Sequence, residues 1–141
     1  MSSRSVLLCL VLAAACASGG ADDEEGIVDF TATIRSNPGF QVNGNAQAIA
    51  SLGRTVVTTA VTNATPAATH PWHVHRGSCG SGGPIVGDAA DYPLLEIDAD
   101  GQDRAVATID VQLEDDEDYY INVHESPQRM SSIVACGALV D

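Results

Sequence analysis

The chain has 141 residues, of which 45% are hydrophobic but only 4% are aromatic, and its formal net charge is -13. With 19 acidic residues and only six basic ones, it cannot form the clustered positive surface that binds nucleic acid, and anionic lipid headgroups would repel it. We therefore expect no nucleic-acid partner, and one modest domain whose core consists of aliphatic side chains.

The first 16 residues predict an export signal. Arg4 precedes an apolar run over 6–12, which is shorter than the roughly 20 residues of a membrane-spanning helix. Small residues directly before Cys16 resemble a bacterial lipobox, although the triplet 15–17 also fits a signal-peptidase site. We favour lipidation at Cys16, because the small and acidic segment 17–26 suits a tether between an anchor and a domain. The predicted location is the bacterial cell envelope, as a lipoprotein, or the outside of the cell.

From residue 27 onward, short β-rich stretches alternate with turn signals, and none has helical periodicity. This spacing predicts an all-β domain over 27–141 that forms a closed barrel or a sandwich. The expected strands are 27–34, 46–52, 55–62, 71–75, 94–97, 105–113, 119–124 and 133–140. We expect the irregular stretches 76–92 and 125–132 to form loops that contribute to a functional site.

Two acidic segments are interpreted as turns. The run 114–118 could hold a hard cation, but it lacks the glycine and the alternate spacing of a calcium loop. Residues 98–101, Asp-Ala-Asp-Gly, predict a hairpin turn. The glycosylation sequon at Asn63 carries little weight in a chain with a lipobox.

Counting the cysteines predicts one disulfide. Cys9 lies within the apolar part of the signal, and Cys16 is assigned to the lipid. Cys79 and Cys136 are then the only pair left, and we expect them to be bonded in an oxidising compartment.

The segment 69–75, Thr-His-Pro-Trp-His-Val-His, is the strongest indication of a functional site. Because alternate residues of a strand share a face, His73 and His75 project together, while the residues between and before them face the core. The same alternation points His124 outward on a late strand, so that three imidazoles would meet on the outer wall if the two strands are neighbours. Imidazole suits copper, zinc, nickel and iron, so these residues do not select the metal. Surface histidines that bind nothing are the alternative.

Four motifs resemble the copper/zinc superoxide dismutases in their order: HPWHVHRGSCGSGGP, DADG, NVHES and a late ACG. The resemblance spans nearly the whole chain after the signal, and it implies an eight-stranded Greek-key β-barrel. It implies one copper ion held by His73, His75 and His124, which would be both the metal ligands and the catalytic residues. It also implies the disulfide that cysteine counting predicts. His70 matches a position that is structural in the family, and we expect its ring to tie a loop to the strand.

The chain departs from this family at several positions. Ile85 stands where the family has the histidine that bridges copper to zinc, and Asp91 matches the zinc aspartate without the zinc histidines, so we expect no zinc. Ile133 stands where the family has the arginine that guides superoxide. Arg76 or Arg129 could substitute from nearby loops, and the negative net charge makes such a cation more necessary.

Three hypotheses follow from these features. The first is an exported copper-dependent superoxide dismutase, in which water supplies the proton that the bridging histidine would have delivered. The second keeps the copper site but uses it to hold copper, or to pass it from a donor to an acceptor, in the periplasm or at the outer membrane. The third is a structural domain whose histidines bind nothing of consequence. The sequence leaves a homodimer open.

Overall fold

The computed structural model describes residues 26–141. The export signal, Cys16 and nearly all of the tether lie outside this range, so the predictions for them stay predictions. The elements are β1 (Val28–Ser36), β2 (Asn43–Ser51), β3 (Arg54–Thr62), β4 (Thr69–His70), β5 (Trp72–Arg76), the short 3₁₀ helix η1 (Ala89–Asp91), β6 (Leu95–Glu96), β7 (Asp103–Ile109), β8 (Tyr119–His124) and β9 (Ile133–Leu139). In the part of the chain that is described, no helix has the length and apolar character that a membrane crossing requires.

The all-β class is confirmed, and each of the eight expected strands is present within a few residues of its predicted ends. The two-residue strand β4 and the helix η1 were not predicted. The expected strand 105–113 is too long, because the ladder ends at Ile109. Beyond that point the Thr55 hydroxyl donates to the carbonyl of Val111 and accepts from the amide of Leu113. A side chain thus satisfies the backbone groups that a longer ladder would have paired.

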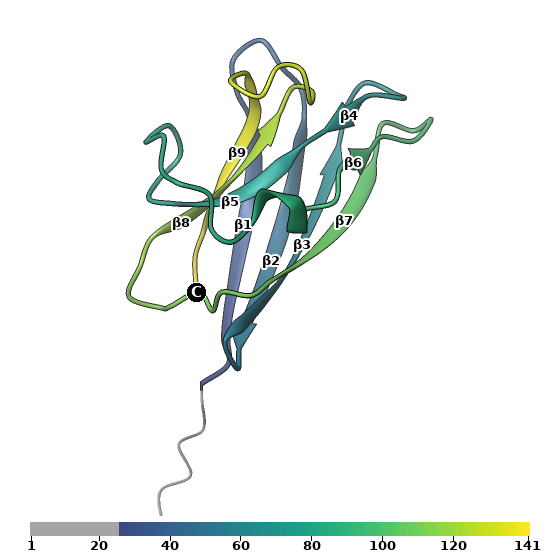
Figure 1. Cartoon of the computed structure of the whole chain (residues 1–141). Helices are drawn as coiled ribbons and strands as arrows, with labels where there is room; N and C mark the ends of the chain where they lie inside the picture. The colour runs from purple at the N-terminus through teal and green to yellow at the C-terminus, as the bar shows by residue number, and fades with distance from the viewer. Residues whose placement is uncertain (1–25) are drawn as a thin grey trace, which may run out of the picture.

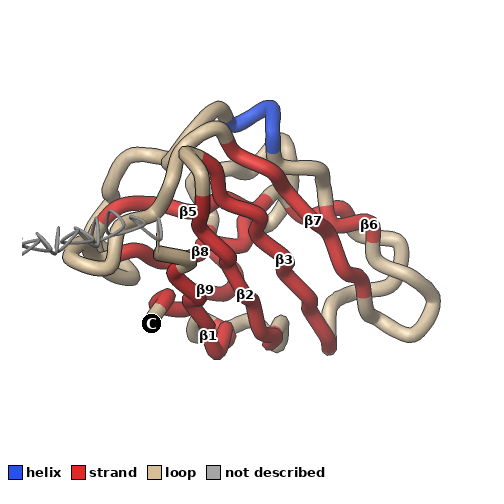
Figure 2. The backbone as a smooth tube through the Cα atoms, turned by 90° about the horizontal axis from the view of Figure 1, so that it is seen from below, coloured by secondary structure: helices blue, strands red, loops and turns tan. Residues whose placement is uncertain are grey.

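Seven strands form one antiparallel sheet in the order β5-β8-β9-β1-β2-β3-β7, and β4 pairs with β6. The sheet curls into a half-barrel (Figure 1, Figure 2). Its two edge strands, β5 and β7, are not hydrogen-bonded to each other, so the barrel is open along that side. The order places β5 and β8 next to each other, although 42 residues lie between the end of β5 and the beginning of β8 in the sequence.

The core fills the inner face of this sheet with small and aliphatic side chains. Strands β1, β2 and β3 alternate buried and exposed residues, as a sheet with one solvated face does. Trp72 and Val74 are completely buried, which confirms that they face the core. The indole nitrogen of Trp72 donates to the carbonyl of Pro93 at 2.7 Å, and this bond fastens the long loop after β5 to the strand.

Strands β5 and β8 differ from the others because both of their faces are covered. The first four residues of β5 and all six residues of β8 are buried. The histidines lie on the face opposite the core, as predicted, but they are shielded from solvent there. The alternative of exposed surface histidines is therefore wrong.

The segment 98–101 forms the predicted turn between β6 and β7, but it is not a hairpin, because β6 pairs with β4 and β7 pairs with β3. The Asp98 carboxylate accepts from the amides of Asp100 and Gln102 at 2.9 Å, and Gly101 has a φ of +77°. Positive φ is the conformation for which a glycine is favoured in such turns.

Candidate metal centre

The pairing of β5 with β8 brings the three histidines together. His73 lies opposite Asn122 and His75 lies opposite Tyr120, while the amide of His124 donates to the carbonyl of Pro71 just before β5. One nitrogen from each of the three rings lies within 4.8 Å of the others, and all three side chains are buried. Within residues 26–141, no other group of three histidine, cysteine or acidic side chains has metal-binding spacing.

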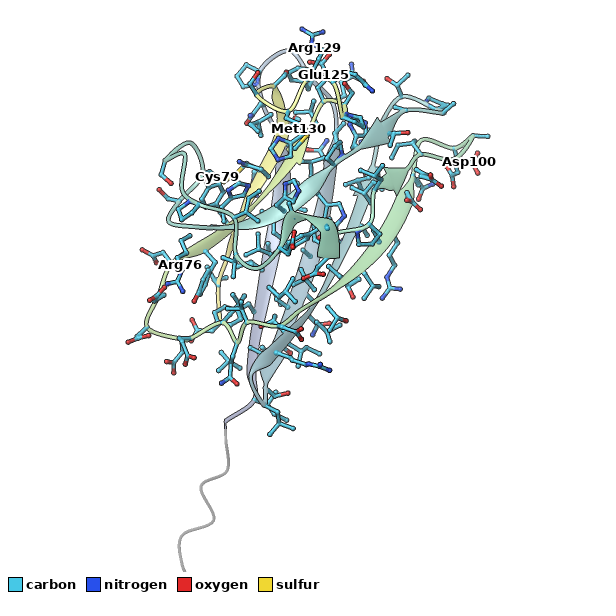
Figure 3. All side chains as sticks on the ribbon, viewed as in Figure 1. Arg76, Cys79, Asp100, Glu125, Arg129 and Met130 are labelled. Atoms are coloured by element: carbon cyan, nitrogen blue, oxygen red, sulfur yellow. A yellow bond between two sulfur atoms is a disulfide. The ribbon has the colours of Figure 1, made fainter. Side chains whose placement is uncertain are left out.

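Backbone carbonyls determine which ring nitrogen is free in two of the histidines. Nδ1 of His75 lies 2.8 Å from the carbonyl oxygen of Gly83, and Nδ1 of His124 lies 2.6 Å from that of Met130 (labelled in Figure 3). A carbonyl oxygen can only accept, so each Nδ1 carries the proton and donates it. Nε2 of both rings is therefore unprotonated and available to a metal ion.

The spacing of the nitrogens fits a single bound metal ion. Nδ1 of His73 lies 3.2 Å from Nε2 of His124. Two imidazole nitrogens bound to one ion at about 2.0 Å each, with tetrahedral angles, lie about 3.3 Å apart. Nε2 of His75 is buried and has no hydrogen-bond partner, an unfavourable state that a bound cation would relieve. The residues thus fit a metal ion, although three imidazoles do not identify it.

Burial favours the neutral form of two of these rings, His73 and His124. Burial, together with the neighbouring His124 and His75, lowers the pKa of His73 to about 4. Burial also lowers the pKa of His124, against an opposing hydrogen bond to the Met130 carbonyl. A neutral imidazole keeps the lone pair with which it binds a metal, so His73 and His124 can bind a metal ion at pH 7.

We expect the metal-free protein to lose stability as the pH falls from 6.5 to 4. The pKa of His73 is near 6.5 in the unfolded chain but about 4 in the folded protein, so the unfolded state binds more protons in this window. Stability should be insensitive to this group above pH 6.5 and decline below it, by roughly 3 kcal/mol in total. Urea unfolding from pH 4 to pH 8 measures the slope. The variant His73→Gln should have a shallower slope than the original protein, and equal slopes would contradict the expectation.

His70 supports the centre without belonging to it. Its Nδ1 donates to the backbone carbonyl of His124 at 2.9 Å, and the side chain is buried. This bond ties β4, the short strand before β5, to the end of β8. The structural role expected for His70 is confirmed, and its ring lies outside the three-histidine group.

The predicted disulfide is also present. Cys79, in the loop after β5, is bonded to Cys136 on β9, and their Cα atoms lie 6.0 Å apart. The bond joins this loop to the strand beside β8 (Cys79 is labelled in Figure 3). Gly83, which accepts the hydrogen bond of His75, belongs to the same loop. A cysteine pair at bonding distance is compatible with an exported protein.

A cavity of about 530 Å³ opens beside the histidines. His75 and His124 form part of its wall, together with the cysteine pair, Ser131 and Ile133. No lysine, arginine, aspartate or glutamate lines it. A small molecule in this cavity would therefore lie beside His75 and His124 and would meet no charged side chain.

Neither arginine that could replace the guiding cation reaches this cavity. Arg76 is paired with Glu117 and lies over the ring of Tyr119, and Arg129 is paired with Glu125 at 2.8 Å. In Figure 3, Arg129 projects from the loop before β9 and Arg76 lies at the far end of β5. Both cations are engaged by carboxylates and absent from the cavity wall.

The two other departures from the family motifs are visible in the structure. Ile85 forms a β-bridge with His75, so it lies beside the centre, but it has no atom that could bind a metal. Asp91 ends the helix η1, is exposed, and is not part of the metal-binding group.

Tyr120 and Asn122 are residues of the candidate site that the sequence analysis did not predict. The Tyr120 ring stacks on His75 with centroids 5.1 Å apart, and its hydroxyl accepts from the amide of Gly83 at 3.0 Å. Both residues share the strand face of His124 at alternate positions of Tyr-Ile-Asn-Val-His. This alternation is the sequence signal that indicates Tyr120 and Asn122 together with His124.

The fold and the site define an all-β protein with a buried three-histidine centre that could bind a metal ion. No family model and no curated protein was found to match the chain. A more specific assignment therefore depends on the motifs and on the side-chain geometry described above.

Proposed function

We propose that the protein is an exported copper protein of the superoxide dismutase type, with one copper ion bound by His73, His75 and His124. The observation that carries this proposal is the buried group of three imidazoles, in which one nitrogen of each ring lies within 4.8 Å of the others. The order of the sequence motifs supports the same family, and with it the eight-stranded Greek-key barrel. The half-barrel sheet and the disulfide are compatible with that fold.

The donor set suits copper, and the order of the sequence motifs favours copper over the other metals that imidazole binds. Three nitrogen donors hold copper(I) well, and water can complete the coordination of copper(II). Structural zinc sites are usually four-coordinate, with ligands that include thiolates or further histidines. In the described chain both candidate thiols are joined in the disulfide, and Asp91 lies outside the group. We therefore propose one copper ion and no zinc.

The proposed reaction is the dismutation of superoxide to dioxygen and hydrogen peroxide. Bound copper would supply a one-electron redox couple that oxidises one superoxide and, with two protons, reduces the next to hydrogen peroxide. The chain's own contribution is to hold the ligand nitrogens unprotonated through Gly83 and Met130 and to leave one side open through the cavity. Because Ile85 cannot carry a proton, water entering the cavity would supply the protons.

The copper-loaded protein is expected to accelerate superoxide decay beyond an equal concentration of free copper, and the rate should rise with ionic strength. The net charge of -13 repels the anion, and no cation in the cavity wall offsets this repulsion. Salt screens the repulsion, so association becomes faster. Superoxide decay after pulse radiolysis, recorded at several salt concentrations, tests both expectations. A rate no higher than that of free copper would exclude the dismutase.

The second candidate function is to hold or transfer copper, and a specific observation favours it. Arg76 and Arg129 are paired with carboxylates, so the cavity lacks the cation that would attract superoxide. A copper carrier needs no such cation. If the copper-loaded protein fails the superoxide assay but gives its copper to a competing chelator, the carrier is the better assignment. A lipid anchor at Cys16 would retain either protein at the membrane.

A further inference from the structure

Asn122 occupies a central position on the metal-binding face. It lies opposite His73 on β5, opposite Cys136 on β9, and two residues before His124 on its own strand. Directly paired residues of neighbouring strands, and alternate residues of one strand, project from the same face of a sheet. The Asn122 side chain therefore stands among the three histidines, although it was not among the expected ligands.

The amide oxygen of Asn122 has no hydrogen-bond partner. It is buried, and it is one of only four side-chain nitrogen or oxygen atoms in this state within the described residues. Nε2 of His75, on the same face, is another. Buried acceptors normally have a hydrogen-bond partner. An acceptor without one has lost the hydrogen bonds to water that it made in the unfolded chain, and this loss destabilises the folded protein. One cation located among these residues would satisfy both atoms.

The centre also lacks a fourth protein donor from the usual ligand types. The residue beside His75 is Ile85, which has no donor atom. Cys79 and Cys136 offer no thiolate because they form a disulfide, and no carboxylate of the described chain lies at metal-binding distance from the three histidines. The amide oxygen of Asn122 lies on the same face as the histidines and has no hydrogen-bond partner, so it can serve as a donor to the metal.

We propose that Oδ1 of Asn122 is the fourth donor to the metal ion, so that the chain itself provides three nitrogens and one oxygen. This inference rests on the metal site of the proposed function. An amide oxygen is a harder donor than imidazole nitrogen or a thiolate, and it stabilises copper(II) more than copper(I). Asn122 would therefore favour the oxidised ion, a selectivity that a purely structural asparagine would not confer.

The test compares Asn122→Leu, which keeps the approximate shape but removes the oxygen, with Asn122→Asp, which keeps an oxygen donor. For the leucine variant we expect copper(II) affinity to fall about 10- to 100-fold, less than for loss of a histidine because water can replace a neutral oxygen donor, while copper(I) affinity stays unchanged. The parallel g value and copper hyperfine splitting in the electron paramagnetic resonance spectrum should also change. The aspartate variant should bind copper(II) at least as tightly as the original protein. Competition titrations with chelators specific for each oxidation state provide the affinities.

Ser131→Ala is the matched control, because Ser131 is another uncharged polar residue of the cavity wall. It should leave the affinities and the spectrum unchanged. Near-ultraviolet circular dichroism verifies that each variant is folded. If the leucine variant does not fold, the aspartate variant still tests whether residue 122 donates an oxygen to the metal. Equal copper(II) affinity and an identical spectrum in the leucine variant, or loss of copper(II) binding in a folded aspartate variant, would overturn the role of Asn122 alone. Absence of copper binding by the unmodified protein would overturn the metal site as well.

Discussion

Replacing His124 by alanine is expected to abolish stoichiometric copper binding. His124 provides one of the three converging nitrogens, and its Nδ1 is already fixed by the Met130 carbonyl. Without Nε2 of His124, only two imidazoles remain, on a single strand. Changes to residues that merely support a ligand lower metal affinity by about 10- to 100-fold, so removal of the ligand itself should exceed that range. Titration of the oxidised, folded domain with copper under a competing chelator measures the loss.

Two further measurements make this result interpretable. Ser131→Ala alters the same cavity without removing a histidine, and it should bind one copper ion as the original protein does. Thermal unfolding without metal should show that the His124 variant is still folded. If this variant kept full affinity, copper would have to bind elsewhere. If the original protein bound no copper, the hypothesis of a structural domain would remain.

Removing the disulfide is expected to lower the free energy of unfolding by about 4 kcal/mol, according to the loop-entropy relation. The bond between Cys79 and Cys136 closes a loop with a sequence separation of 57. Without this constraint the unfolded chain gains conformations, while the folded chain gains few. Such a loss is a large part of the 5–15 kcal/mol, roughly, that stabilises a typical domain. Urea unfolding of the double variant Cys79→Ser with Cys136→Ser, at pH 7 and without metal, measures it.

The disulfide also bears on the metal centre through Gly83. Gly83 follows Cys79 in the same loop, and its carbonyl holds Nδ1 of His75. A loop released from β9 should orient His75 less well, so we expect weaker copper binding in the folded double variant. The original protein, unfolded with its disulfide intact and again after reduction, provides the comparison. A double variant as stable as the oxidised protein would contradict the entropic role of the bond.

The strands were predictable because their signal is local. Alternation with a period of two places Trp72 and Val74 on the core face and His73 and His75 on the other, whatever the rest of the chain does. The structure confirms that arrangement. The end of β7 was not predictable, because the groups that end it belong to Thr55, more than fifty positions away in the sequence. Long-range side-chain bonds leave no periodic trace in a sequence.

The candidate site also has features that the sequence predicts and features that only the structure shows. Cysteine counting needs no spatial information, and the structure confirms the pair that it predicts. The pairing partners of Arg76 and Arg129 depend on how two loops fold, so the substitute cation suggested by the sequence could not be tested without the structure. The same holds for the carbonyls that select the free nitrogens of His75 and His124.

By itself, the amino-acid sequence determined the all-β class, the strand faces that carry the histidines, and the cysteine pair. These properties follow from local periodicity and from composition, which the chain possesses before it folds. Only the tertiary structure decided that β5 lies beside β8, that loops bury the histidines, and that Asn122 stands opposite His73. The physical reason is that strand register and loop packing are set by contacts between residues far apart in the chain, whose partners no local pattern specifies.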